Sequence, residues 1–276
     1  MIPTAQEVKT SWNAFASQYS ETMENSNLQI ALSLARMAGV SSAKNVLEIA
    51  CGSGRLTLDL LQTLPAGTKY TSVDISEEMI KLATAAKEKI KDKLNDIEHQ
   101  FVVANGEELS FIPDESVDVV IAPLCMHLTP DPNSLLKEAL RVLKKGGRIG
   151  FSVLGDLKQC TFFNIVSNAI KETGVELPQK RSIFYLGSRE KMIKLAEDNG
   201  IKVDFCWLEY ITQSIHTVED TTILYNTPAN VKTLSSLSEE NRAKVIEGIE
   251  KTFREFQKTF TPLQIETVLL VGRKPE

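Results

Sequence analysis

The sequence predicts an α/β fold built on a mostly parallel sheet. Between residues 44 and 154, short apolar runs typical of strands alternate with longer amphipathic runs typical of helices. In the first strand–helix pair, the turn Gly52-Ser53-Gly54 separates the two elements. Strands joined through helices lie parallel, because each crossover returns the chain to the same end of the sheet.

Two helices are expected before the sheet begins. Residues 6–19 carry apolar side chains at helical spacing, and a second amphipathic run ends at Gly39. On spacing alone, Trp12, Phe15 and Tyr19 are most simply an apolar face packed on the core.

Five strands and three helices follow in alternation. The strands are expected at residues 45–50, 69–74, 98–104, 117–122 and 148–154, and the helices at residues 56–64, 79–90 and 134–143. Ser76 is placed to cap the second of these helices, with Glu77 and Glu78 near its positive end. One residue departs from the pattern: Glu48 is an acid inside a strand that should be wholly apolar.

Beyond Gly155 the alternation is lost. Helical runs are expected at residues 162–173, 188–199 and 238–260, separated by stretches that carry aromatic residues and proline. These helices are more than sheet crossovers need, and they are as well explained by a wall of a binding pocket as by plain core. No repeat or linker divides the chain, so a single domain is expected.

Composition excludes several classes of protein. The chain has 276 residues, a net charge of −5 and a pI near 5.5, so it offers no basic face to nucleic acid or to an anionic membrane. The four cysteines are scattered without metal-ligand spacing, which favours free thiols and no metal site. The N-terminal residues lack a signal sequence and no run reaches transmembrane length, so a cytoplasmic protein is expected.

The glycine turn and the end of the second strand point to a nucleotide-like ligand. Gly52 and Gly54 let a ligand approach the backbone closely, and Asp74 stands where a carboxylate accepts hydrogen bonds from ribose hydroxyls. A dinucleotide-binding dehydrogenase shows a similar pattern, but Thr57 occupies the position of its third glycine.

The combination E-x-A-C-G-S-G-R-L-T followed by V-D-I-S-E-E-M-I resembles the class I S-adenosylmethionine-dependent methyltransferases. The resemblance is to the small-molecule branch that includes the ubiquinone and menaquinone biosynthesis methyltransferases, and it runs from about Trp12 to Gly155. It implies a Rossmann-like, seven-stranded, mostly parallel sheet with an antiparallel last strand. The sixth strand is then expected at residues 203–211 and the last at 266–273. The domain would comprise a helical lid (1–40), a cofactor-binding core (41–155), acceptor-pocket helices with the sixth strand (156–262) and the last strand (263–276).

The resemblance implies a set of cofactor-binding residues at the carboxyl ends of the strands. In it, Asp74 holds the ribose, Ile75 and Met79 flank the adenine, and Glu48 orients the amino end of the methionine. Asn105 stands where the family usually has Asp, so this contact would carry no charge. The full set is Tyr19, Glu48, Ala50, Gly52, Ser53, Gly54, Asp74, Ile75, Met79, Asn105, Gly106, Glu107, Ala122 and Leu124.

The acceptor side rests on the resemblance and on aromatic residues. The pattern of Trp12, Ala16 and Tyr19 is similar to the lid helix of the family, which excludes water from the reaction. The residues expected to contact the acceptor are Trp12, Phe15, Tyr185, Trp207 and Tyr225.

His127 follows the fourth strand, where the family places residues between cofactor and acceptor. His127 could have a purely structural role, as a hydrogen-bonded buried histidine. Alternatively, it could act as a base or orient the acceptor. Cys125 lacks any motif that would make it a nucleophile, and no acyl-transfer triad, zinc signature or P-loop can be assembled.

We therefore expect a methyltransferase that uses S-adenosylmethionine and a small, partly apolar acceptor, with no nucleic-acid or membrane partner. Two alternatives stay open: an NAD-dependent oxidoreductase on a similar sheet, and a catalytically inactive subunit that binds the cofactor and regulates a partner.

Overall fold

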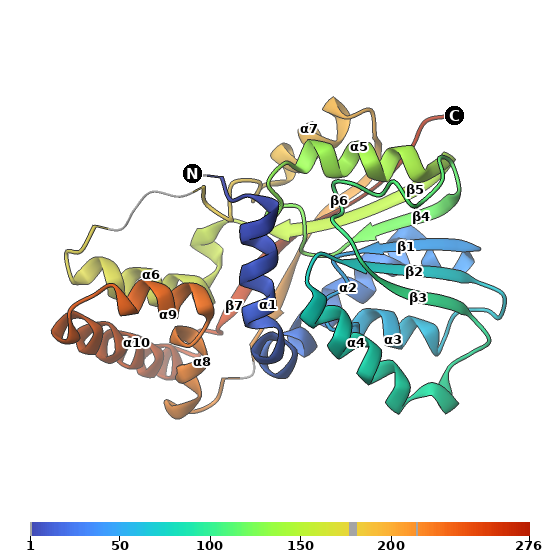
Figure 1. Cartoon of the computed structure of the whole chain (residues 1–276). Coiled ribbons are helices and arrows are strands. Elements are labelled where there is room, and N and C mark those ends of the chain that lie inside the picture. The colour runs from blue at the N-terminus through green and yellow to red at the C-terminus, as the bar shows by residue number, and fades with distance from the viewer. Residues whose placement is uncertain (1, 177–180, 214) are drawn as a thin grey trace.

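A seven-stranded sheet organises the protein. The computed structural model describes residues 2–176, 181–213 and 215–276. Within these residues the strand order is β3-β2-β1-β4-β5-β7-β6 (Figure 1). The strands are β1 (Asn45–Ile49), β2 (Lys69–Asp74), β3 (Glu98–Val103), β4 (Val117–Ala122), β5 (Leu143–Leu154), β6 (Lys202–Thr212) and β7 (Gln264–Arg273).

All strands except β7 run in one direction. The pairs β1–β2, β1–β4, β2–β3 and β4–β5 are parallel, and β7 pairs antiparallel with both β5 and β6. The mostly parallel sheet with an antiparallel last strand is thus confirmed. Because β7 reverses, the carboxyl ends of the other six strands and the start of β7 meet at one edge of the sheet.

Helices cover both faces of the sheet. The α-helices are α1 (Ala5–Thr22), α2 (Glu24–Ala38), α3 (Arg55–Leu61), α4 (Glu77–Lys89), α5 (Pro132–Val142), α6 (Thr161–Glu172), α7 (Arg189–Asp198), α8 (Thr222–Tyr225), α9 (Pro228–Ser235) and α10 (Glu239–Thr259). Short 3₁₀ turns lie at Val40–Ser42, Lys91–Lys93, Leu157–Gln159 and Glu219–Thr221. In Figure 1, α2, α3 and α4 lie on one side of the sheet and α5 and α7 on the other.

Successive side chains of the inner strands point alternately to the two faces of the sheet, and each face has its own hydrophobic core. Val46 of β1 packs with the α2 and α3 side of the sheet, whereas Leu47 and Ile49 pack with the α5 side. Neighbouring strands repeat the pattern, so both faces are apolar, as a sheet covered on both sides requires. Glu48 therefore points to the same face as Val46, toward α3.

The two N-terminal helices differ in their burial. Leu34, Ala35 and Ala38 of α2 are fully buried against the sheet, whereas Ala16 is the one buried residue of α1. Helix α2 is therefore part of the core, which does not fit the expected lid over residues 1–40.

Helix α1 stands across the edge where the parallel strands end. It begins with a capping box between Thr4 and Glu7. It docks on the start of α4, where Lys9 pairs with Glu77 at 2.6 Å and Ser76 Oγ donates to Asn13 Oδ1 at 2.7 Å. These contacts are polar, and exposed ion pairs of this kind contribute little to stability.

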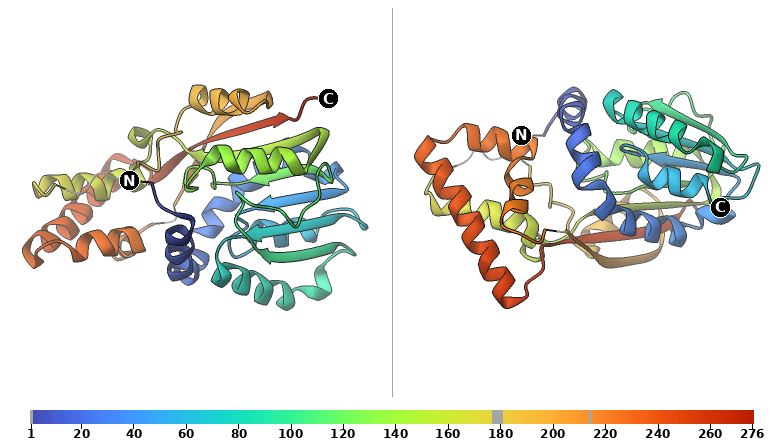
Figure 2. Two further views of the ribbon diagram at one scale, coloured as in Figure 1. Left: turned by 45° about the horizontal axis from the view of Figure 1, so that its top comes forward. Right: turned by 90° about the horizontal axis from the view of Figure 1, so that it is seen from below.

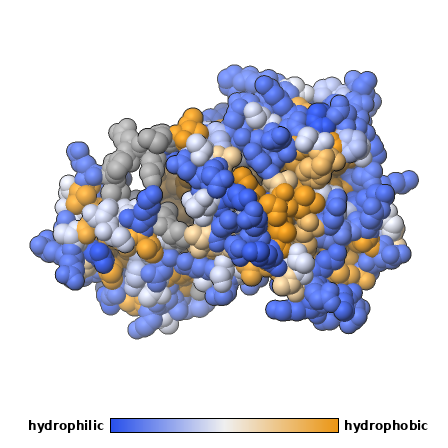
Figure 3. All heavy atoms as spheres, viewed as in Figure 1, coloured by the Kyte–Doolittle hydropathy of each residue, from blue (hydrophilic) through white to orange (hydrophobic). Residues whose placement is uncertain are grey.

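A group of helices, α6 with α8, α9 and α10, lies beyond the same edge of the sheet. Both Figure 1 and Figure 2 place α1 between this group and the sheet. On the face shown in Figure 3, hydrophobic surface gathers in the middle, beside α1, within a hydrophilic surround. None of the described helices is long and apolar enough to cross a membrane.

Candidate functional site

Two adjoining cavities lie where the parallel strands end beneath α1. The larger one holds about 100 Å³ and the smaller about 50 Å³. Tyr19, Ala50, Gly52, Pro123 and Leu124 line both, so the two spaces meet at the glycine turn. The predicted cofactor residues that line the larger cavity are Tyr19, Ala50, Gly52, Asp74, Ile75, Met79, Asn105, Gly106 and Leu124.

The glycine turn owes its shape to backbone conformations that side chains rarely adopt. Ala50, directly after β1, has φ 59°, Gly52 has φ 58° and Gly54 has φ 87°. A β-carbon on Gly54 would lie 3.0 Å from the Ala83 β-carbon, so this position also needs glycine for close packing against α4. Ser53, between the two glycines, is buried and does not line either cavity.

Asp74 ties the end of β2 to the glycine turn. Its carboxylate accepts from the backbone N–H of Gly52 and from that of Ser76, both at 2.9 Å. The residue is 7% exposed, and burial raises the pKa of the carboxyl group while the backbone donors lower it. The carboxylate lines the larger cavity, which suits the hydrogen bonds to ribose hydroxyls expected from the sequence.

Glu48 is a buried acid held by hydroxyl groups. Thr57, Tyr70 and Ser72 donate to the same oxygen, Oε2, at 2.5, 3.0 and 3.3 Å. Burial raises the pKa of this carboxyl group to about 7, against the lowering effect of these three donors. Glu48 lines the smaller cavity. None of these three hydroxyl groups donates to the second oxygen, Oε1, which can therefore accept from a ligand.

The segment after β3 forms a tight turn at the cavity. The Asn105 side-chain carbonyl accepts from the Glu107 N–H at 3.1 Å, and both Asn105 and Gly106 line the larger cavity. A β-carbon on Gly106 would come within 2.6 Å of Ile49. The Glu107 carboxylate turns away to accept from the Asp131 N–H at 3.0 Å, so it caps the loop before α5 instead of lining either cavity.

Aromatic residues of α1 cover the cavities. Trp12 and Tyr19 line the larger one, and their ring centroids lie 5.4 Å apart in an edge-on arrangement. Phe15 contacts both rings from outside the cavity lining. Asn27 of α2 donates to the Tyr19 hydroxyl at 3.0 Å, which fixes the ring beside Gly52.

The loop after β4 brings Leu124 and Cys125 to the larger cavity but leaves His127 outside its lining. His127 is 4% exposed, and its Nδ1 has no hydrogen-bond partner among the described residues. Burial and the nearby Arg181 charge lower the pKa of His127 to about 3, so the imidazole is neutral and weakly basic. Burial raises the pKa of Cys125 to about 12, which keeps its thiol protonated and unreactive.

The remaining predicted residues lie elsewhere. Ala122 is buried at the end of β4. Tyr185 packs beneath the Arg181 guanidinium, 4.6 Å from the ring centroid, and the Trp207 indole N–H donates to Glu209 at 2.7 Å. Tyr225 ends α8. The structure does not bring Tyr185, Trp207 or Tyr225 to either cavity.

Among the residues of the smaller cavity that sequence reasoning missed, three have charged or amide side chains: Glu24, Asn27 and Arg55. Glu24 and Asn27 come from the start of α2, directly after a helix break at Met23 that the apolar pattern does not mark. Only the placement of α1 over the glycine turn could have indicated them.

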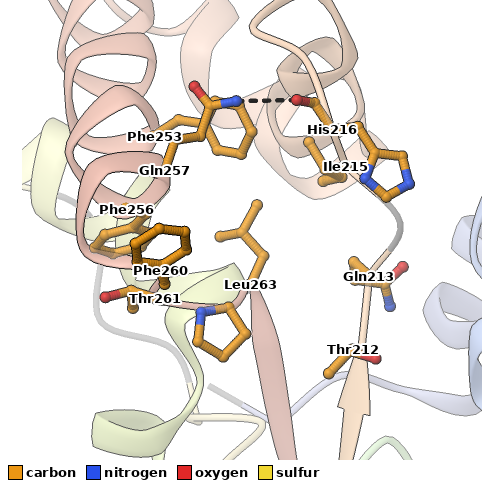
Figure 4. A pocket seen from close by; sticks show the side chains of 11 residues that line it. Thr212, Gln213, Ile215, His216, Phe253, Phe256, Gln257, Phe260, Thr261 and Leu263 are labelled. Carbon is orange, nitrogen blue, oxygen red and sulfur yellow. Dashed lines mark hydrogen bonds between the residues drawn. The ribbon is translucent and has the colours of Figure 1, made fainter.

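A further cavity of about 300 Å³ lies apart from this site, between α10 and the ends of β6 and β7 (Figure 4). Gln257 closes one side by donating to the His216 carbonyl at 2.9 Å. None of the residues predicted to bind cofactor or acceptor lines it. Among the described residues no group of three or more His, Cys, Asp and Glu side chains could hold a metal ion.

The residues that line the two adjoining cavities have the chemistry to bind S-adenosylmethionine. The larger one offers a buried carboxylate beside the glycine turn and apolar walls at Ile75 and Met79 for a nucleoside. The smaller one offers carboxylates and a guanidinium for an amino-acid end. The glycine turn, where the two meet, lets a ligand pass close to the backbone.

Comparison with known proteins agrees with this geometry. Residues 47–151 match the methyltransferase domain family. A demethylmenaquinone methyltransferase of Lactococcus lactis is 31% identical over 148 residues, which cover 51% of this chain and 56% of that protein. The thiol S-methyltransferase TMT1B of Rattus norvegicus is 32% identical over 129 residues, covering 47% of this chain and 50% of that protein. The chain thus spans about half the length of these curated relatives.

Solved structures share the fold at low sequence identity. The [4+2]-cyclase SpnF superposes with a TM-score of 0.61 at 15% identity, covering 100% of this chain and 97% of that one. A phosphoethanolamine N-methyltransferase 2 of Haemonchus contortus, solved with S-adenosylhomocysteine, has a TM-score of 0.56 at 17% identity, covering 100% of this chain and 61% of that one. At these identities the likeness concerns the fold alone.

Proposed function

We propose that this protein transfers a methyl group from S-adenosylmethionine to a small molecule, on the premise that residues 47–151, which match the methyltransferase domain family, form a class I methyltransferase domain that uses this cofactor. One observation carries the proposal. Asp74, Gly52 and Glu48 line two cavities that meet at the carboxyl ends of the parallel strands, where such sheets bind ligands.

When bound, the cofactor supplies a methyl group on a sulfonium, and this carbon bonds to the acceptor's lone pair as the carbon–sulfur bond breaks. The chain's part is to bind and align. In the proposal Asp74 accepts from the ribose hydroxyls, Ile75 and Met79 flank the adenine, and Glu48 accepts from the amino group. Alignment and exclusion of water supply much of the acceleration in a displacement of this type.

The acceptor is proposed to enter beside α1. Val8, Trp12, Leu128 and Pro130 give the larger cavity an apolar wall, which suits a partly apolar molecule. Relatives named for demethylmenaquinone and for thiols make hydroquinones and thiols the first acceptors to test.

Helix α1 is proposed to act as the lid. The cavities of about 100 and 50 Å³ are smaller than the roughly 300 Å³ or more of a typical small-molecule site. Entry of the cofactor therefore needs a wall to move, and α1 is a wall with a single buried residue, Ala16. Its polar contacts to α4 can open at little cost.

No general base is assigned. His127 lies outside the cavity lining with a pKa of about 3, and the Cys125 thiol stays protonated. An acceptor with an ordinary nucleophilic lone pair, or one that has lost its proton in solution, needs no base from the protein.

The proposal is tested by two measurements on the whole chain. Calorimetry should show binding of S-adenosylhomocysteine and none of NAD. A panel of hydroquinones, thiols, phenols and amines, incubated with S-adenosylmethionine, should include members that release S-adenosylhomocysteine. Binding of NAD in place of S-adenosylhomocysteine would identify an oxidoreductase, and cofactor binding without turnover of any acceptor would identify a regulatory subunit.

A further inference from the structure

A second carboxylate reaches the smaller cavity from the start of α2. Glu24 lines this cavity together with Glu48, Asn27 and Arg55. Glu48 belongs to the predicted cofactor set, whereas Glu24 lies outside every motif in the sequence. It is partly buried, in a chain whose other acidic residues are mostly on the surface, and a buried acid needs a compensating partner.

Glu24 is held in one position by the glycine turn. Its Oε1 accepts from the Ser53 N–H at 3.0 Å, and its Oε2 accepts a short hydrogen bond from Ser53 Oγ. Ser53 Oγ in turn lies 2.9 Å from Ser20 Oγ of α1. Three elements, α1, α2 and the turn, therefore fix where this carboxylate points.

The Glu24 carboxylate lies beside Gly52, the point where the two cavities meet. A β-carbon on Gly52 would come within 3.1 Å of Glu24 Oε1 and 3.6 Å of the Tyr19 ring. Gly52 lines both cavities, so a ligand that spans them reaches from Asp74 in the larger cavity, past Gly52, to Glu24 in the smaller one. The absence of a side chain at Gly52 keeps this passage open.

The charges around the smaller cavity call for a cation. Glu24 and Glu48 contribute carboxylates, Asp74 is close by at Gly52, and Arg55 is the one cationic side chain that lines it among the described residues. The Arg55 guanidinium also forms an ion pair with the Asp59 carboxylate at 3.5 Å. Burial raises the pKa of Glu24, and the Glu24 charge adds to the rise for Glu48 and Tyr19. A ligand ammonium placed there would relieve this repulsion.

We propose that Glu24 is a second carboxylate for the α-ammonium group of the cofactor, acting beside Glu48 to position the methionine end. The proposal rests on the proposed function, because it needs the cofactor to occupy the two cavities. It assigns Glu24 to recognition of charge, whereas a purely structural Glu24 would serve only to cap the glycine turn.

The test compares two ligands that differ only at the amino-acid end. S-adenosylhomocysteine carries the ammonium, and 5′-methylthioadenosine has the same nucleoside and thioether without it. Calorimetry on the whole chain should show that Glu24→Gln weakens S-adenosylhomocysteine roughly 10- to 100-fold, the scale for a lost hydrogen bond to a charged group. The affinity for 5′-methylthioadenosine should stay within about twofold of the parent value on the same reasoning. Glu21→Gln, on the exposed side of α1, is the matched control and should change neither affinity.

Three results would overturn the proposal. Unchanged affinity for S-adenosylhomocysteine would leave Glu24 without a ligand. Equal weakening of both ligands would make it a structural cap of the turn. Tighter binding of S-adenosylhomocysteine would mean that Glu24 competes with the ligand carboxylate. If the parent protein bound neither ligand, the proposed function itself would fail. Should Glu24→Gln not fold, Glu24→Asp keeps the charge but retracts it, and the same loss confined to S-adenosylhomocysteine is expected.

Discussion

Thr57 of α3 donates to Glu48 of β1 across a distance of 2.5 Å, in the interior between the helix and the sheet. Thr57 occupies the position where a dinucleotide-binding turn carries its third glycine. The hydroxyl and the acid therefore belong together: the threonine supplies the hydrogen bond that lets a carboxylate remain in a buried strand. The same pair distinguishes this site from that of a dehydrogenase.

Replacing Glu48 should change how stability depends on pH. The pKa of Glu48 is about 7 in the folded protein and 4.5 in its ordinary state. Because the folded pKa is raised, the stabilising contribution is complete below pH 4.5 and is lost as the pH rises to about 7, by about 3 kcal/mol. Glu48→Gln removes this loss, so the variant should gain on the parent between these pH values.

The measurement is urea unfolding of both proteins at several pH values between 4.5 and 8. Glu98→Gln, at the exposed start of β3, serves as the control and should leave the pH dependence of the parent unchanged. Equal pH dependence in the Glu48→Gln variant and the parent would mean that the pKa of Glu48 is the same in the folded and the unfolded state.

Asp74→Ala should weaken cofactor binding without abolishing the fold. The change removes an acceptor for ribose hydroxyls, and a cost of about 1.5–3 kcal/mol in S-adenosylhomocysteine affinity is expected. Calorimetry gives the affinity, and a thermal unfolding scan shows that the variant is folded. Asp92→Ala, on an exposed 3₁₀ turn, should bind like the parent. An Asp74→Ala variant with parental affinity would contradict the ribose assignment.

Two N-terminal truncations should behave differently. Removing residues 1–22 takes away α1, which buries only Ala16, so the remainder should still unfold cooperatively but lose turnover because water reaches the site. Removing residues 1–38 also takes away Leu34, Ala35 and Ala38 of the core. Core losses cost about 2–5 kcal/mol for a single large side chain, so the longer truncation should not fold. Circular dichroism on heating distinguishes the two, and normal turnover by the shorter truncation would show that α1 is no lid.

His127→Gln should leave the rate of methyl transfer within a factor of about three of the parent, because a neutral, weakly basic imidazole is a poor proton acceptor. For an acceptor that does not lose a proton in the reaction, kcat/KM should depend on pH in the same way in His127→Gln and in the parent. A general base would instead give a loss of roughly 100- to 10,000-fold in the variant. Such a loss, with cofactor affinity unchanged from the parent, would show that His127 acts on the acceptor.

The sequence indicated the fold because its local patterns agree with its tertiary structure. The strand–turn–helix at Gly52 and Gly54, the cap at Ser76 and the apolar run of β4 each specify one local conformation, and they combine in only one handedness. Asp74 and Asn105 could be placed at one edge of the sheet for the same reason, since each lies at or just after the end of a strand, and both line the larger cavity.

The acceptor side could not be predicted in the same way. Tyr185, Trp207 and Tyr225 are aromatic residues on irregular segments, and nothing in their spacing tells which wall they join. His127 illustrates the same limit: its position after β4 is a sequence property, but its burial near Arg181 depends on a segment 54 residues further along the chain. Glu24 could not be placed from the sequence, because the helix break at Met23 does not interrupt the helical spacing of the apolar residues.

The place of β7 between β5 and β6 has a consequence for the order in which the molecule can be made. During synthesis β6 emerges some 50 residues before β7, yet it has no neighbour to pair with until β7 arrives, since β5 is bonded to β7. Phe205, Leu208 and Tyr210 of β6 are apolar and remain partly exposed even in the finished sheet. A nascent chain therefore carries an unpaired, adhesive strand through the whole interval in which α8, α9 and α10 are made. All three of these helices must therefore be made before β7 can join β5 to β6 and complete the sheet.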